Sequence, residues 1–470
     1  MEDVLQSKEV AVPQRGQKEL IKSLRRVCGW IRYAFRAERS HLAGASAGRL
    51  MILGSRYRLL IEEVQTEYLP YLVETDEAYC PPEVGMAVDR LVERIDANSV
   101  VILHPSESGI PKIRAERDLE ARYLRQLGKY APLGAAPGDE KPRLFIFLSY
   151  PQVMARSPLI HTIILSHEIE HLDDWKKGLS AELSSGMDLT SKDLKELVED
   201  LGKLRIGGER GALPPLTVGE LFEQARIEAL VGERWIQVRA NWLAEIVSDL
   251  LAVRNFGPAY FFALGLWSLQ VDAMYAHSDS HPSSRLRLSL MAEELRSMGL
   301  TYYSAGALGT ARAHFDQWNT LLENSQPTDV KLIHHVAQQH VRRAFPRIRE
   351  AVRAASGAAT GLTMDKKDDI EYAVGLLRHG APPAEVLEPS GRTLRPCPLA
   401  AIFNAYFIFQ SAHLDYLYQL LDANTDEEKR EALVKLDKLV LKAVEGSEVK
   451  RMWDDEAAAV PPGEGTLHAD

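Results

Sequence analysis

Apolar residues in the middle of the chain form short strand-like runs and longer helix-like stretches. The run 143–148 is rich in strand formers, and Pro151 ends it. The stretch 159–165 is apolar and lacks glycine and proline, which is typical of a buried helix, and it leads directly into the polar residues that follow. Upstream, the pattern predicts a helix over 81–95 and a strand over 100–105. Together these elements predict a small sheet beside a buried helix.

Helical periodicity dominates the rest of the chain. It covers residues 17–74, the region 242–251, a stretch from 258 to 275 and nearly all of 299–461. The predicted fold class is therefore mainly α with a small β-sheet (α+β). The first of these regions carries scattered arginines: Arg25, Arg26, Arg32, Arg36 and Arg39. Because acidic residues soon follow them, we interpret these arginines as a solvated face rather than a nucleic-acid site.

The length of 470 residues exceeds one typical domain, so two or three structural units are expected. We divide the chain into a helical N-terminal region (1–79), a central domain (80–300), a helical C-terminal region (301–455) and a disordered tail (456–470). A glycine- and proline-rich stretch at 207–215 predicts a surface loop, with a gate over a cleft as the alternative.

Charge and cysteine usage exclude some classes of function. The formal net charge is −10, which argues against general nucleic-acid binding because phosphate contacts need a basic surface. The N-terminus has no apolar signal core, and the cysteines, Cys28, Cys80 and Cys397, are few and far apart. We expect a protein of the reducing cytoplasm in which no cysteine is a nucleophile or a metal ligand.

Two nearly uncharged stretches bear on membrane association. The stretch 255–271 contains Gly257, Pro258 and Gly265 and predicts a buried helix. The stretch 396–414 approaches the roughly 20 residues that a membrane span requires. Its polar residues favour a core helix over a membrane span: Asn404, Gln410, Ser411 and His413. A partner-binding or membrane-facing helix is the alternative. No membrane span is expected.

His167 and His171 stand four residues apart at the end of the predicted buried helix, with Glu168 beside the first. This spacing directs both imidazoles to one side of a helix, where they can bind one metal ion. Zinc held in this way lowers the pKa of a water molecule, and Glu168 can take its proton and pass it to a leaving amine. The pattern predicts zinc-assisted hydrolysis. A helix whose histidines only cover a surface is the alternative.

Two histidines leave a zinc site short of a third protein ligand. Within the apolar stretch 242–251, Glu245 and Asp249 stand four apart, and carboxylates rarely enter an apolar region unless they are paired or bind metal. We assign Glu245 as the third ligand and Asp249 as an acceptor that orients a ligand histidine. The alternative is a pair of salt-bridged or capping carboxylates on a solvated helix face.

His281 precedes Pro282 in a loop just before a predicted helix. A histidine in this place could stabilise the oxyanion that forms when water attacks a peptide carbonyl. A histidine that merely precedes a helix entry is the alternative.

The three motifs together resemble the zinc peptidase family that includes the CAAX prenyl proteases and the HtpX and Oma-type proteases. They are HExxH at 167–171, ExxxD at 245–249 and His281-Pro282, with Arg287 six residues after the histidine. The resemblance covers about residues 80–300 and implies a zincin-like catalytic domain of the glutamate-ligand (gluzincin) type.

The resemblance also implies a role for each matching residue. It makes His167, His171 and Glu245 the zinc ligands, Glu168 the catalytic base, and Asp249 a residue behind the ligands. It places His281 and Arg287 beside the active site. This chain departs from the family at Glu170, where a small residue is common, so packing is altered or a charge faces an exposed edge. It also lacks the membrane-embedded character of many members.

The sequence therefore predicts a soluble zinc metallopeptidase that acts on a protein or peptide substrate. Two other readings remain open: a catalytically silent zinc-binding scaffold whose C-terminal helices bind a regulatory partner, and a peptidase with one narrow substrate. In the C-terminal region, His334, His335 and His340 lack the spacing of a metal site, and we interpret them as surface residues.

Overall fold

The computed structural model describes most of the chain and divides into two compact units, Met1–Ile169 and Glu170–Asp470. The described residues are 15–72, 81–106, 112–132, 143–151, 158–206, 218–270, 274–275, 277–299, 331–356, 367–388, 393–459 and the isolated positions 5, 313, 316–317, 320 and 391. The stretch 207–215, expected as a loop or gate, and Cys80 lie outside them. The four-region division made from the sequence stays a prediction.

The first unit contains a three-stranded sheet with the strand order β1-β3-β2. β1 (Ser99–Ser106) and β3 (Leu144–Pro151) are parallel, with Val101 opposite Ile146, and both strands were predicted. β2 (Lys112–Arg117) pairs antiparallel with β3 and was not predicted. The small sheet in a mainly helical chain confirms the coarse fold class.

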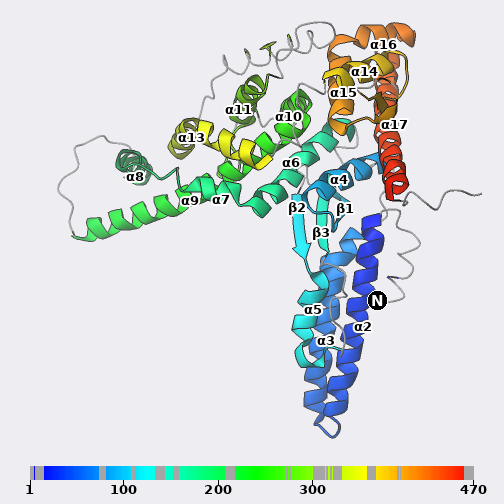
Figure 1. Ribbon diagram of the computed structural model, residues 1–470. Helices are drawn as coiled ribbons and strands as arrows, with labels where there is room; N and C mark the ends of the chain where they lie inside the picture. Colours follow the sequence, from blue (N-terminus) through cyan, green and yellow to red (C-terminus); the bar gives the residue numbers. More distant parts are fainter. Residues whose placement is uncertain are drawn as a thin grey trace, which may run out of the picture. The chain divides into compact units, whose positions relative to one another are not determined.

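Helices complete the first unit (Figure 1). α2 (Arg15–His41) and α3 (Ala47–Tyr68) form a hairpin, followed by the short helix η1 (Leu69–Tyr71). α4 (Pro82–Ile95) begins one residue after the predicted start and ends where predicted, and α5 (Leu119–Leu127) leads into η2 (Gly128–Tyr130). Side chains of the hairpin, α5 and the sheet share one apolar core that includes Leu24, Tyr57, Tyr68, Tyr123 and Phe147.

α6 (Pro158–Lys177) is the predicted buried helix, and the division between the units falls inside it. The second unit continues with α7 (Leu179–Ser184), α8 (Ser191–Ile206) and the long α9 (Val218–Phe256). α10 (Pro258–Gln270) is shorter than predicted. It is followed by α11 (Ser284–Ser297) and α13 (Leu332–Ser356). α9 packs on α7, α8, α11 and α13 through a core that includes Trp235, Trp242, Leu286 and Phe345.

The C-terminal part of the second unit consists of helices and one antiparallel pair of strands. Its elements are α14 (Lys367–Arg378), β4 (Glu385–Leu387), β5 (Leu394–Pro396), α15 (Leu399–Ala412), α16 (Leu414–Leu420) and α17 (Asp426–Ala459). The side chains of Ile402, Phe403 and Phe409 on α15 are buried, which confirms the core-helix interpretation of this stretch. α17 continues through Ala459, four residues into the segment expected to be a tail, and 460–470 lie outside the described residues.

None of the described helices is both long and apolar enough to cross a membrane. Cys28 and Cys397 are buried free thiols.

Candidate metal centre

α6 and α9 bring three potential ligands together. His167 and His171 lie one turn apart on α6, and Glu245 lies on α9. One ligand atom from each of the three residues lies within 4.8 Å of the others, and no second group of this kind occurs among the residues that the structure describes. The apolar approach along α6 is buried at Leu159 and Ile163. The sequence-based choice of these three residues thus corresponds to one cluster.

The spacing within this cluster fits a zinc ion. His171 Nε2 lies 3.3 Å from Glu245 Oε1. Tetrahedral zinc, with bonds of about 2.0–2.1 Å to nitrogen and oxygen, holds neighbouring ligand atoms about 3.3 Å apart. Two histidines and one carboxylate are also a donor set found in catalytic zinc sites. The described residues therefore offer three suitable ligand types, with His171 and Glu245 at a suitable separation and all three ligand atoms within 4.8 Å of one another.

The two oxygens of Glu245 have different neighbours. Oε2 lies 3.2 Å from Nη1 of Arg287, whereas Oε1 lies 3.3 Å from His171 Nε2 and 3.4 Å from Nε2 of His281. Arg287 is itself fixed by two hydrogen bonds to Asp249, of 2.6 and 2.7 Å. Arg287 thus occupies one side of the Glu245 carboxylate and leaves Oε1 to face the histidines.

Burial makes this ion cluster rigid. The side chains of Arg287, Glu245 and Asp249 are each less than one-tenth exposed. Burial alone would lower the pKa of Arg287, but the neighbouring carboxylates of Asp249 and Glu245 outweigh it and raise that pKa well above its ordinary value. A buried guanidinium that stays charged can hold the orientation of both carboxylates.

Asp249 and Ser248 support different ligands. Asp249 accepts a hydrogen bond of 2.6 Å from the hydroxyl of Tyr260, and through Arg287 it acts on Glu245. The role expected of Asp249, orienting a histidine, is filled at His171 by Ser248, whose Oγ lies 2.9 Å from Nδ1 of that ring. Ser248 was missed in the sequence, although it follows Glu245 by three residues and so shares its helix face.

Glu170 is fully buried, so of the two alternatives expected for it, altered packing and a charge at an exposed edge, the second is wrong. Its Oε1 accepts a hydrogen bond of 2.8 Å from Nδ2 of Asn255 on α9. The residue that departs from the family pattern therefore joins α6 to α9. Glu168, the expected base, is partly buried between the two histidines on α6.

His281 lies at the solvent-accessible side of Glu245. Its side chain is 50% exposed, and its Nδ1 lies 2.8 Å from Oγ of Ser280. Ser278 Oγ accepts a hydrogen bond of 2.8 Å from the His281 backbone N–H. The loop ends at Ser283, which caps α11 by accepting a hydrogen bond from the N–H of Leu286. The structure thus brings His281 within reach of the expected ligand.

A second layer fixes the loop that carries His281. Trp242 of α9 stacks on His277 and donates a hydrogen bond of 2.9 Å to the carbonyl of Ser278. Nδ1 of His277 accepts a hydrogen bond of 3.0 Å from the N–H of Ser283. Burial and the nearby His334 lower the pKa of His277 to about 4, so this acceptor is neutral at physiological pH.

Asp279 ties the same loop to two further helices. It forms two 3.0 Å hydrogen bonds with Arg234 of α9, and its Oδ1 lies 2.8 Å from Nε2 of His334 on α13. His340, also on α13, lies 3.0 Å from Asp193. The interpretation of these histidines as surface residues is therefore wrong for His334 and His340, which are buried.

Comparison with known proteins adds no assignment: no family model, no curated protein and no solved structure matches this chain. The case for a function therefore rests on the residues of the site.

Proposed function

We propose that this protein is a zinc-dependent metallopeptidase that hydrolyses peptide bonds in a protein or peptide substrate. The proposal rests chiefly on one observation, the convergence of His167, His171 and Glu245 with a separation of 3.3 Å between His171 Nε2 and Glu245 Oε1. Three protein ligands leave the fourth position of a tetrahedral zinc for water and substrate.

Zinc in this centre would lower the pKa of a water molecule and polarise the substrate carbonyl. Glu168 would take a proton from the attacking water and donate it to the leaving amine. His281 donates a hydrogen bond to the developing oxyanion from the accessible side of the centre. Arg287 and Ser248 hold Glu245 and His171 in place. Arg287 and Ser248 are thus positioning residues, and Glu168 and His281 are catalytic ones.

The substitution Glu168→Gln tests this assignment because it removes the base and keeps the size of the side chain. Cleavage of a broad peptide library, read by mass spectrometry, is expected to fall by about 10²–10⁴-fold. The zinc content is expected to stay at the wild-type value. Glu182→Gln, at an exposed position of α7, is the matched control and is expected to cleave like wild type. Full cleavage by Glu168→Gln would contradict the proposal.

A second candidate is a zinc-binding scaffold without catalysis, whose C-terminal helices bind a partner. It is favoured by α14–α17, because the described residues of these helices include none of the candidate site residues. Measurements of zinc content and peptide cleavage on the wild-type protein distinguish the two functions. A scaffold retains zinc but cleaves nothing in the library, whereas a peptidase cleaves and loses activity when a chelator removes the metal.

A further inference from the structure

The α2–α3 hairpin is basic in a chain that is acidic as a whole. Residues 20–60 contain nine lysines and arginines against one glutamate, a formal charge of +8, whereas the whole chain carries −10. The sequence-based interpretation set this charge aside because acidic residues soon follow. The structure shows where those acidic residues lie.

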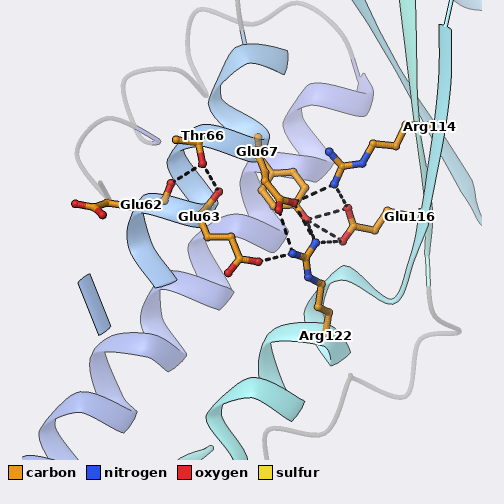
Figure 2. Close-up of polar contacts among 8 residues, drawn as sticks. Glu62, Glu63, Thr66, Glu67, Arg114, Glu116 and Arg122 are labelled. Carbon is orange, nitrogen blue, oxygen red and sulfur yellow. Dashed lines mark hydrogen bonds and ion pairs between the residues drawn. The ribbon is translucent and has the colours of Figure 1, made fainter. Parts of the chain in front are cut away.

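Two of the three acidic residues of α3, Glu63 and Glu67, belong to a separate ion network at the far end of the hairpin, and the third, Glu62, pairs with Arg58 on the same helix. Figure 2 shows Arg122 among Glu63, Glu67 and Glu116, with Arg114 bridging the last two. Arg114 Nη2 lies 3.0 Å from Glu67 and 2.9 Å from Glu116. The hydrogen bond from Arg122 is the main cause that lowers the pKa of Glu67. These carboxylates are therefore engaged by arginines from β2 and α5 and do not neutralise the tip.

The basic side chains of α2 follow one face of the helix. Arg25, Arg32, Arg36 and Arg39 are spaced by seven, four and three residues, and all are exposed. In an α-helix of 3.6 residues per turn these spacings place side chains on the same side. The stripe therefore runs along α2 to its last turn, beside the tip of the hairpin.

Apolar side chains are exposed on α3 at the same tip. Met51, Ile52 and Leu59 are 71%, 69% and 63% exposed, and Leu50 is 40% exposed. The opposite side of α3 is the one that packs into the core, through Leu53, Tyr57, Val64 and Tyr68. The outward side is thus an apolar surface that no described residue covers, in a segment rich in arginine.

The turn between the helices carries no charge. Residues 42–48 are one leucine followed by alanine, glycine and serine only, and Arg49 and Leu50 come directly after them. Figure 1 shows this turn at the end of the hairpin away from the sheet. The tip therefore presents small and apolar groups first, with arginines immediately behind.

The arrangement of Leu50, Met51 and Ile52 indicates what covers them. Consecutive helical residues point about 100° apart, so these three span roughly 200° around the end of α3. A flat protein surface would meet one side of the helix, whereas the fluid interface of a bilayer can surround all of them. Arg49 is exposed beside Leu50, and Arg39 lies in the last turn of α2, so both are close enough to the tip to reach lipid phosphates. Arg56 is paired with Glu38 at 3.3 Å instead.

We propose that the tip of the α2–α3 hairpin binds the surface of an anionic lipid bilayer, with Leu50, Met51 and Ile52 among the headgroups and the arginines on lipid phosphates. Apolar insertion and attraction to anionic lipid together give stable binding where either alone is marginal. The attachment is peripheral and does not depend on the proposed peptidase activity.

Sedimentation with vesicles tests the proposal on the full chain. Wild type is expected to bind vesicles of phosphatidylcholine and phosphatidylserine, to bind phosphatidylcholine alone at least tenfold more weakly, and to dissociate at high salt. Met51→Ser with Ile52→Ser, and separately Arg36→Gln with Arg39→Gln, are each expected to weaken binding at least tenfold. These side chains are exposed, so the variants are expected to keep the thermal midpoint of wild type.

Met452→Ser with Trp453→Ser is the matched control, because these two neighbouring residues on α17 are also large, apolar and more than half exposed, but precede Asp454 and Asp455. The control is expected to bind vesicles like wild type. Absence of wild-type binding to the anionic vesicles, or equal binding by the Met51/Ile52 variant, would overturn the proposal. Self-association in light scattering that the Met51/Ile52 variant abolishes, without vesicle binding, would assign the surface to a second copy instead.

Discussion

Nη1 of Arg287 lies 3.2 Å from Oε2 of Glu245, whereas Oε1 of the same carboxylate lies 3.3 Å from Nε2 of His171 and 3.4 Å from Nε2 of His281. A carboxylate without this partner could rotate and present either oxygen. Because Asp249 fixes Arg287 with two hydrogen bonds, the orientation of Glu245 is set before any ligand arrives. Under the proposed function, Glu245 would then reach the metal ion through Oε1 as a monodentate ligand.

Replacing Arg287 should destabilise the protein as well as the metal site. Arg287→Met leaves Glu245 and Asp249 buried without a cation, and loss of one partner of a buried ion pair costs about 3–5 kcal/mol. The thermal midpoint and the zinc content are both expected to fall. Arg296→Met, at an exposed position of the same helix, is the control and should change neither. A stable Arg287→Met protein with full zinc would show that Arg287 does not orient Glu245.

The loop that carries His281 should depend on a histidine outside the centre. His334→Phe removes the contact with Asp279, so hydrogen–deuterium exchange of residues 277–283 is expected to rise while zinc content stays unchanged. Under the proposed function, kcat/KM is expected to fall by about 10- to 100-fold, because misplaced catalytic groups are costly.

His335→Phe provides a close control for that experiment. His335 is the next residue of α13 but is exposed, and its contact is with Gln339 of the same helix. The His335→Phe variant is expected to show the wild-type hydrogen–deuterium exchange of residues 277–283 and the wild-type kcat/KM. If His334→Phe leaves the exchange of residues 277–283 unchanged, Asp279 and His334 do not hold the loop.

Local patterns in the sequence were sufficient to predict several elements of the fold and the three residues of the metal cluster. β1, β3, α4 and α6 were found from short-range periodicity, and the i, i+4 spacing of His167 and His171 fixed their side of the helix. β2 was missed because Ile113 and Ala115 are its only apolar residues and stand among charged ones, so it contains no apolar run, as is common for an edge strand.

Side chains with distant partners could not be placed from sequence alone. His334 resembles a surface residue in a locally basic segment, and its burial follows from Asp279, 55 residues earlier in the chain. Asp249 has the spacing of a residue behind a ligand, but its partner Arg287 lies on another helix and directs it to Glu245. Periodicity gives the face of a helix, whereas the partner on that face depends on tertiary packing.

Asp437 of α17 should lower the stability of the protein above about pH 6. Burial raises the pKa of Asp437 to about 6, although the hydrogen bond from Tyr406 opposes this. The folded state therefore binds the proton more tightly than the unfolded state, so stability falls as pH rises from about 4 through about 6. Asp437→Asn is expected to raise the thermal midpoint by about 2–4 °C at pH 8.

The pH dependence separates this effect from ordinary changes in packing. The gain from Asp437→Asn is expected to shrink as pH falls through about 6 towards 4, where Asp437 is protonated in the folded state and begins to be protonated in the unfolded state as well. Asp415→Asn, at an exposed position of α16, should have no such dependence. An equal gain at pH 4 and pH 8 would mean that the Asp437 carboxylate carries no ionisation cost in the folded protein.

The most direct test of the metal centre is zinc per chain, measured by elemental analysis on wild type, Glu245→Ala and the control Glu233→Ala, purified side by side without added metal. Glu233 is an exposed glutamate of the same helix. We expect about one zinc in wild type and in the control, and a sharp reduction in Glu245→Ala, because two histidines alone bind zinc weakly. No zinc in any of the three, even after metal is supplied, would contradict the proposed centre.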